Sequence, residues 1–318
     1  MTDSRFRDSA RYWRTPLLPG ADLVTAEYNE HTFAPHWHEA YTIPVIEGGA
    51  ECYRYRGSQH VAVAGSVPVI NPGELHTGSR AVDEGWSYRV MYVPIDFLHE
   101  LAEQIAGRAQ PLPWFDTDVI HDLDLAHRLS RSHRLLEADA DRRRTAAGPE
   151  PGASVHACDV AALHRPSGAS CPAPGPDLLA VEGALLDALS TLLTRYGRTR
   201  EEALRHGPND PRVETMKALL AADLATPLRV ADLAQAVGLS PFHATRLFTQ
   251  ATGLPPHAWR TQLRLQRALG PLREGASVAD VAVASGFTDQ SHFTRHFRRM
   301  FGVPPGRWQS SQAHARPV

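Results

Sequence analysis

Hydrophobic and polar residues alternate in short runs over residues 20–95. The runs YTIPVIEGG, ECYRYRG, QHVAVAG, SVPVINPG and WSYRVMYVPI are rich in β-branched and aromatic residues, and Gly or Pro punctuates them. Their spacing of roughly 8–12 residues is typical of a small β-barrel or sandwich. We therefore expect residues 1–95 to form a β-domain preceded by a short N-terminal arm.

From about residue 96 the hydrophobic period becomes that of helices. Segments 96–107, 122–142 and 177–197 are predicted helices, and the third is strongly apolar, with Leu178, Val181, Leu185, Leu189 and Leu192 at intervals of three and four. Residues 142–176 are instead rich in Pro, Gly, Ala and Ser and poor in aromatics. Because such a segment buries too little apolar surface to fold, we predict a disordered insertion within a helical section, 96–208.

The last segment, 209–318, is helical in pattern and repeats itself. FHATRLFTQATGLPP at 242–256 and SHFTRHFRRMFGVPP at 291–305 share seven of fifteen letters at an offset of 49. VADLAQAVGLS precedes the first copy and VADVAVASGFT precedes the second, and each contains a glycine near its end. Helix, glycine-containing turn and helix is the layout of a helix-turn-helix, whose second helix enters the major groove of DNA.

The outward faces of the two second helices are the predicted DNA-binding surface. Phe248 and Phe297 are expected to pack inward, and the helical period then turns other residues toward solvent. Arg and Gln can make bidentate contacts to guanine and adenine, and an exposed Phe can touch a thymine methyl group. The predicted DNA-binding residues are Phe242, His243, Thr245 and Arg246 in the first unit, and Gln290, Ser291, His292, Thr294, Arg295, Arg298 and Arg299 in the second.

Charge supports DNA binding at this end of the chain. Residues 209–318 hold 13 Lys and Arg against 7 Asp and Glu, a net charge of +6, whereas the remainder has a net charge of −8. A helix from about Pro256 to Gly270 is expected to hold the two units apart. On it, Arg260, Arg264 and Arg267 fall on one side and face either phosphates or solvent.

The chain shows no sign of a membrane or secreted protein. No apolar run approaches the ~20 residues of a membrane span, and the charged start, MTDSRFRDSARYWRT, is unlike a signal peptide. Three cysteines without CxxC spacing argue against a disulfide framework or a zinc knuckle. We therefore expect a cytoplasmic protein with no membrane partner.

The stretch from about 212 to 308 closely resembles the DNA-binding domain of AraC/XylS-type transcriptional regulators. ADLAQAVGLSPFHATRLFTQATGLPPHAW and SVADVAVASGFTDQSHFTRHFRRMFGVPPGRW carry the resemblance, most strongly in the second unit. It implies a bihelical domain of seven helices and base-reading roles for Phe242, Thr245, Arg246, Gln290, His292 and Arg295. It also implies RNA polymerase as a partner, and a homodimer through helix 177–197 paired with 120–138. Packing of that helix against the β-domain is the alternative.

The β-domain resembles a cupin barrel through HTFAPHWHEAYTIPVIEGG and GSVPVINPGELHTG. His36 and His38 alternate on a strand and face one side, and with His76 they are a possible set of divalent-metal ligands. However, the cupin enzyme pattern also has a carboxylate six residues after the first His, where this chain has Thr42. We therefore expect a sensor without a cofactor.

The predicted effector pocket combines aromatic walls with a few polar groups. Because a one-residue slip of a strand reverses which side chains point inward, a plain core role for the tyrosines and Trp86 stays open. The candidates are His36, His38, Tyr41, Thr42, Tyr53, His76, Trp86 and Tyr88.

Together these patterns predict an α+β protein of several domains. A cupin-like sensor and a helical dimerisation section precede an all-α domain, 209–318, with two helix-turn-helix units. The predicted function is effector-responsive, sequence-specific transcription regulation, with activation favoured and no catalysis. Its expected partners are double-stranded DNA, a small-molecule effector, a second copy of the chain and RNA polymerase. The alternative is a metal-dependent cupin enzyme with three histidine ligands fused to a helical domain.

Overall fold

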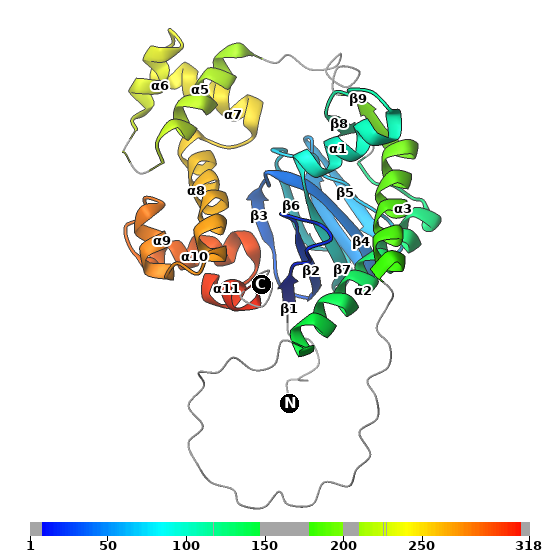
Figure 1. The fold of residues 1–318 in the computed structure, drawn as a ribbon. Helices are drawn as coiled ribbons and strands as arrows, with labels where there is room; N and C mark the ends of the chain where they lie inside the picture. The colour runs from blue at the N-terminus through cyan, green and yellow to red at the C-terminus, as the bar shows by residue number, and fades with distance from the viewer. Residues whose placement is uncertain are drawn as a thin grey trace, which may run out of the picture.

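The structure, a computed structural model, describes residues 8–116, 118–146, 178–199, 210–224, 226 and 228–312. Figure 1 shows two parts, a twisted β-sheet with helices along one side and a separate group of helices that stands beside it. This arrangement confirms the predicted fold class. In the described segments, no helix is both long and apolar enough to cross a lipid bilayer.

One antiparallel sheet of seven strands forms the N-terminal part, in the order β1-β2-β7-β4-β6-β3, with β5 paired to β4. Its strands are β1 (Ser9–Trp13), β2 (Asp22–Tyr28), β3 (Phe33–His36), β4 (Ala40–Tyr55), β5 (Ser58–Val63), β6 (His76–Arg80) and β7 (Trp86–Pro94). The first half of β4 pairs with β7, and its second half pairs with β5 and β6. One long strand thus replaces the two predicted at 41–49 and 51–57, and it links both halves of the sheet.

Glycine permits the change of partner along β4. Gly49 has a φ of +65°, and a Cβ there would lie 2.0 Å from the carbonyl oxygen of Gly85. Any side chain would therefore force the two strands apart at the bend. The predicted strand at 66–73 forms only isolated bridges, at Val67 and Ile70, because its Pro68 and Pro72 cannot donate ladder hydrogen bonds.

Helices cover the outer face of the sheet (Figure 1). They are α1 (Ile95–Ala106), α2 (Leu123–Ala146) and α3 (Leu178–Tyr196), with a small sheet of β8 (Pro113–Phe115) and β9 (Gly197–Thr199) beside them. Four of the five residues of the apolar stripe predicted on the third helix are buried in this core: Val181, Leu185, Leu189 and Leu192. Leu178 is instead exposed, because it is the first residue of the helix. The stripe therefore packs within the chain, which was the alternative to a dimer surface.

The predicted insertion begins too early. α2 continues to Ala146, because Arg142 and Arg143 both pair with the buried carboxylate of Asp139, at 2.5 and 2.6 Å, and hold the last turns helical. The start at 142 is therefore wrong. Residues 147–176 lie outside the described residues.

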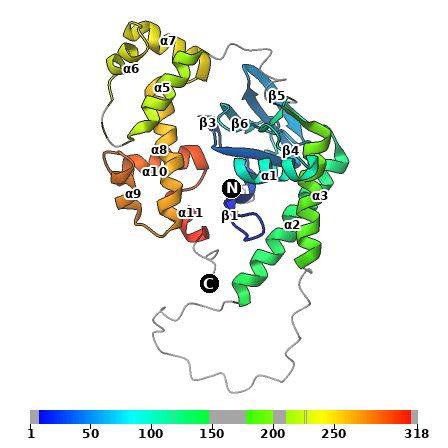
Figure 2. The ribbon, with the colours of Figure 1, turned by 45° about the horizontal axis from the view of Figure 1, so that its top comes forward.

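Seven helices form the described part of the C-terminal region. They are α5 (Pro211–Ala222), α6 (Val230–Ala236), α7 (Pro241–Thr252), α8 (Pro256–Arg273), α9 (Val278–Ala284), α10 (Gln290–Phe301) and α11 (Pro305–Gln312). Figures 1 and 2 show α8 between the α5–α7 group and the α9–α11 group. At 1.5 Å per residue its 18 residues span about 27 Å, and it runs three residues past the predicted end at Gly270.

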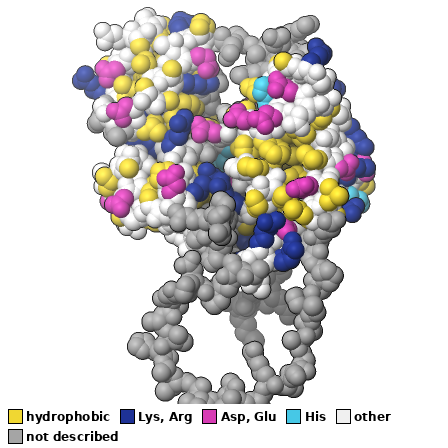
Figure 3. All heavy atoms as spheres, viewed as in Figure 1, with side chains coloured by type: hydrophobic (Ala, Val, Ile, Leu, Met, Phe, Trp, Pro, Cys, Tyr) yellow, Lys and Arg dark blue, Asp and Glu magenta, His cyan; other side chains and the backbone are white. Residues whose placement is uncertain are grey.

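The helical part is docked on the sheet. The hydroxyl of Tyr12 on β1 donates to the carbonyl oxygen of Phe301 at 2.7 Å, and Trp37 stacks on Trp259 of α8 with ring centroids 5.5 Å apart. Arg273 pairs with the buried Asp22, and Figure 3 shows charged side chains of both signs along this seam. A single hydrophobic cluster runs from the sheet into α8–α11. The two parts therefore share a core.

Candidate nucleic-acid interface and effector cavity

Two helix-turn-helix units are built as the repeat predicts. α6 with α7 and α9 with α10 each meet at a glycine of positive φ, +65° at Gly238 and +76° at Gly286. Ser240 caps α7 by accepting from the backbone N–H of His243, and Asp289 caps α10 by accepting from that of His292.

The predicted inward phenylalanines are confirmed. Phe248 and Phe297 are both 0% exposed, each at the centre of its own unit. With these side chains buried, the opposite face of each second helix is turned to solvent.

The face of α7 is open. The side chain of Phe242 is 68% exposed, and His243 and Arg246 are exposed beside it, with Thr245 half-buried. An exposed phenylalanine next to a guanidinium matches the chemistry of a thymine methyl group next to a guanine edge. The structure thus brings all four predicted residues of the first unit onto one surface.

The face of α10 is more basic. Arg295, Arg298 and Arg299 are exposed along it, with Gln290 and Ser291 at its start. Thr294 is half-buried, and His292 is turned toward the cap, where its Nδ1 lies 2.8 Å from the hydroxyl of Thr288. Six of the seven predicted residues therefore share a surface, and His292 lies at its edge.

This face borders the sensor. Gln290, Ser291, Thr294 and the three arginines line a hollow of about 780 Å³, whose far wall is His31 and Thr32 of the β2–β3 turn. DNA backbones flank a helix on both sides when it enters a major groove. The β2–β3 turn therefore lies beside the predicted DNA-binding face of α10.

Two of the three arginines of α8 have roles other than those predicted, whereas Arg267 is exposed to solvent. Arg260 is buried and donates to the backbone carbonyls of Asp223 and Thr226. Arg264 donates to the carbonyl of Leu224 at 2.8 Å, and Arg267 lies 3.6 Å from Glu39 of the sensor. A stripe facing phosphate or solvent is therefore wrong for Arg260 and Arg264, because they close the loop after α5.

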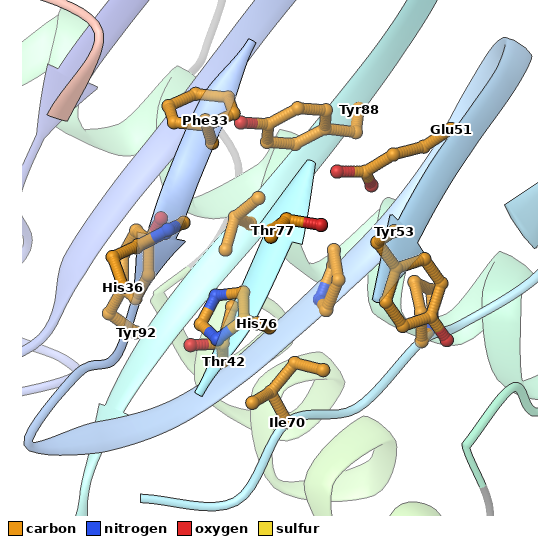
Figure 4. Close-up of a pocket in the computed structure, with 13 residues that line it drawn as sticks. Phe33, His36, Thr42, Glu51, Tyr53, Ile70, His76, Thr77, Tyr88 and Tyr92 are labelled. Carbon is orange, nitrogen blue, oxygen red and sulfur yellow. The ribbon is translucent and has the colours of Figure 1, made fainter. Parts of the chain in front are cut away.

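Inside the sensor, five of the eight predicted pocket residues line one cavity of about 50 Å³. They are His36, Thr42, Tyr53, His76 and Tyr88. Figure 4 shows them around the space between β3, β4, β6 and β7. Sequence reasoning missed Phe33, Glu51 and Tyr92 in the same wall. Glu51 and Tyr53 alternate along β4, which could have signalled that both face inward.

The other three candidates lie elsewhere. Tyr41 is buried in the core beneath α1–α3 and donates to the carbonyl of Pro113 at 2.6 Å. Trp86 is buried and stacks on Tyr88, with ring centroids 6.3 Å apart, outside the cavity. His38 lies behind His36 and His76, against Tyr92 and α8.

Burial sets the charge state of the cavity. It lowers the pKa of His36 and His38 well below the usual range, with each protonated neighbour adding repulsion, and it lowers the pKa of His76 to about 4. Although Glu51 keeps some exposure, protein atoms surround its carboxyl group and raise the pKa to about 8. At neutral pH the cavity therefore holds neutral imidazoles and a mostly protonated carboxyl group.

Known protein families match both parts of the chain, the sensor and the C-terminal helical region. Residues 18–149 match the family model described as an AraC-like ligand binding domain, and residues 233–311 match a helix-turn-helix domain. The HTH-type transcriptional regulator YbfI of Bacillus subtilis is 23% identical over 262 residues, covering 82% of this chain and 81% of that protein.

Two further relatives match over a shorter length. The HTH-type transcriptional regulator GbdR of Pseudomonas aeruginosa is 32% identical over 145 residues, 43% of this chain and 40% of that protein. The transcriptional activator NphR of Rhodococcus is 36% identical over 132 residues, 40% of this chain and 38% of that protein. The chain thus spans about two fifths of these two relatives.

A solved structure has the same two-part architecture. The crystal structure of apo ToxT from Vibrio cholerae aligns over 98% of this chain and 99% of that chain, with a TM-score of 0.53 and 13% identity. At this identity the likeness concerns the fold alone. With an AraC-like ligand-binding domain, paired helix-turn-helix units and relatives that are transcriptional regulators, this DNA-binding chain belongs to the AraC/XylS family of transcription regulators.

Proposed function

We propose that this chain is a sequence-specific transcription activator that responds to a small molecule held in the sensor cavity, and that it has no catalytic role. The observation that carries the proposal is the pair of exposed, arginine-bearing faces on α7 and α10, each backed by a fully buried phenylalanine. Arg246 and Arg295 then read base edges, while Arg298 and Arg299 meet phosphates.

The cavity supports a small effector with polar groups. Its volume of about 50 Å³ holds only a few water-sized groups, and the polar side chains in its wall include those of Glu51, Thr42, Thr77, His36 and His76. Thr42 stands where the cupin enzyme pattern has a carboxylate, which supports binding rather than catalysis.

A homodimer and a contact with RNA polymerase complete the proposal. Although the inner stripe of α3 is buried, Leu179 and Leu186 are 74% and 46% exposed on its outer face, one above the other at a spacing of seven. Sedimentation of the full chain at micromolar concentration tests the dimer, and a monomer there contradicts it. Activation is supported by the relative NphR, which is a transcriptional activator.

The test of the central function is competition for DNA. Duplexes selected from a random pool by the full chain should bind ~10³-fold or more tightly than random duplex at the same salt concentration. Equal affinity for selected and random duplex would mark a purely architectural DNA-binding protein and contradict the proposal.

A further inference from the structure

Three buried histidines converge where the sensor meets the DNA-binding domain. His36 ends β3 and faces its cross-strand partner His76 at the start of β6, while His38 follows in the turn before β4. The ring centroids of His36 and His76 are 4.3 Å apart, and that of His38 lies 5.0 and 5.4 Å from them. One nitrogen of each ring lies within 4.8 Å of the other two. We call these three residues the histidine cluster.

Backbone carbonyls orient two of the rings. The Nδ1 atoms of His36 and His76 lie 2.8 and 3.1 Å from the carbonyl oxygens of Ala34 and Glu74. Because a carbonyl can only accept, each Nδ1 carries the proton and each Nε2 carries a lone pair. An imidazole whose other nitrogen donates to a carbonyl is the usual arrangement of a metal-binding histidine.

Two buried polar atoms near these lone pairs have no hydrogen-bond partner among the described residues. They are Nε2 of His38 and the hydroxyl oxygen of Thr42. Buried polar atoms are normally satisfied, so both atoms are able to interact with a bound ligand. The cavity of about 50 Å³ that reaches His36, His76 and Thr42 has room for an ion and its remaining ligand.

His38 also contacts the DNA-binding domain. Nε2 of Gln266, on α8, lies 2.7 Å from the carbonyl oxygen of Trp37 and 3.3 Å from Nδ1 of His38. The amide donates to the carbonyl, and it therefore also donates to His38, whose Nδ1 must accept. In this state the proton of the neutral His38 ring is on Nε2.

An ion in the cluster is incompatible with that hydrogen bond, whichever nitrogen of His38 binds it. If Nδ1 is the ligand atom, the ion replaces the Gln266 donor. If Nε2 is the ligand atom, the ring proton moves to Nδ1, and two donors then face each other. Either way, Gln266 loses one of its two contacts with the sensor.

We propose that the histidine cluster binds a divalent first-row metal ion of the Zn²⁺ class, and that the ion loosens the docking of α8 on the sensor. Three neutral imidazoles are typical ligands for such ions. Tetrahedral Zn–N bonds of ~2.0–2.1 Å place nitrogens roughly 3.3 Å apart, so the rings need to approach by no more than about 1.5 Å. The metal site stands on its own, and its effect on DNA rests on the proposed function.

Metal binding is tested on the purified full chain, stripped by a chelator and titrated with Zn²⁺ or Co²⁺ alone. We expect one equivalent per chain, and a Co²⁺ absorption spectrum of low-coordinate nitrogen ligation. X-ray absorption of the wild-type Zn²⁺ form should show several imidazole ligands, which needs no variant. Less than a tenth of an equivalent bound, or a spectrum of fully hydrated Co²⁺, overturns the site.

Variants assign the ligands. His36→Ala or His76→Ala should weaken metal binding at least about tenfold. The matched control is His60→Ala, on β5, whose ring hydrogen-bonds to the carbonyl of Tyr55 away from the cluster. An equal loss in the His60 variant, with all three proteins folded by circular dichroism, contradicts the assignment.

Coupling is tested by DNA affinity with and without saturating Zn²⁺. Because docking holds α10 beside the β2–β3 turn, the ion should raise the affinity for a selected duplex about three- to tenfold. Gln266→Ala should abolish this response. Gln262→Ala is the matched control, since Gln262 bonds to Trp37 and Pro35 one turn earlier on α8 without touching a histidine, and it should keep the response.

The outcomes separate the two proposals. No DNA binding either with or without metal sinks the proposed function and leaves the metal titration untouched. Normal DNA binding with no metal bound overturns this inference alone. Metal binding without a change in DNA affinity, or the same response in the Gln266 variant as in wild type, overturns the coupling.

Discussion

The unit built on α7 and the unit built on α10 bury equivalent phenylalanines, Phe248 and Phe297, yet they pack against different parts of the molecule. Phe248 lies in a cluster made only of α5–α8 residues. Phe297 lies in the cluster that continues into β1, β2 and β3 of the sensor. The face of α7 is open, whereas that of α10 shares a hollow with His31 and Thr32.

This difference indicates the route of the signal. A change in the sensor reaches α10 directly, through Tyr12, Phe33 and the β2–β3 turn. It reaches α7 at the C-terminal end of that helix, where Leu75 of the sensor lies against Gly253, and along α8, whose Gln262 and Gln266 hold the sensor backbone. We therefore expect a change in the sensor to affect the second unit more strongly than the first. Coupling of this kind requires two arrangements that the effector and DNA bind with different affinity.

The largest effect is expected when each phenylalanine is removed in turn, which tests this contrast. Phe297→Ala and Phe248→Ala should each destabilise their unit by about 3–5 kcal/mol, because a fully buried ring leaves a cavity. Only the first should also reduce hydrogen-exchange protection in β1 and β2, across the shared core. Equal protection of those strands in both variants would contradict the contrast.

A second test separates the bases that each unit reads. Arg295→Ala should cost about 1–3 kcal/mol and relax preference at one base position, and Arg246→Ala should do the same at a different position. The measurement is binding to a panel of single-base variants of a selected duplex. Lys217→Ala is the control, since that amine pairs with Glu214 away from both faces and should leave the preference unchanged.

Acidic pH should lower the free energy of unfolding of the sensor. His133 on α2 is buried, and burial, followed by repulsion from Arg89, lowers its pKa to about 3. An unfolded histidine titrates near pH ~6.5, so unfolding takes up a proton between about pH 6.5 and 3. Stability is therefore lost as pH falls through this window, by about 1.4 kcal/mol per pH unit for this one group.

Urea unfolding of the full chain between pH 7 and 5 measures this slope. His133→Gln should reduce the slope of the free energy of unfolding against pH by up to the equivalent of one proton, about 1.4 kcal/mol per pH unit. His257→Gln, at an exposed position on α8, should not change it. An unchanged slope in the His133 variant would show that other groups carry the acid sensitivity.

The smallest expected effect is at the contact between the sensor and the C-terminal helices. Tyr12→Phe removes the hydrogen bond to the carbonyl of Phe301, which should weaken docking by about 1 kcal/mol. Affinity for a selected duplex should then rise by up to roughly fivefold. Tyr196→Phe removes a hydrogen bond to Asp122 on the far side of the sensor, and it should leave DNA affinity unchanged.

The sequence predicted local structure well, because local signals determine it. The repeat, its two turn glycines and its phenylalanines specify each helix-turn-helix unit, and these predictions are confirmed at Gly238, Gly286, Phe248 and Phe297. The apolar period of α3 likewise predicted its buried stripe. The predicted start of the insertion at 142 was too early. The ion pairs of Asp139 support the end of α2, and composition alone does not reveal them.

Contacts between distant segments were not predictable. Whether Arg260 faces phosphate or backbone depends on how the loop after α5 folds over α8, which helical periodicity does not contain. Tyr41 and Thr42 are neighbours on β4, and only the pairing of β4 with β7 decides which of them faces the cavity. The role of Gln266 against His38 follows from docking, and no motif signals it.

The most direct test of the account is a footprint of the full chain on a selected duplex. For each bound chain we predict two protected tracts about one helical turn apart, roughly 10 base pairs, on one face of the DNA. Arg246→Ala should weaken one tract and Arg295→Ala the other. A single tract, or weakening of the same tract by both variants, would contradict two units that read successive major grooves across α8.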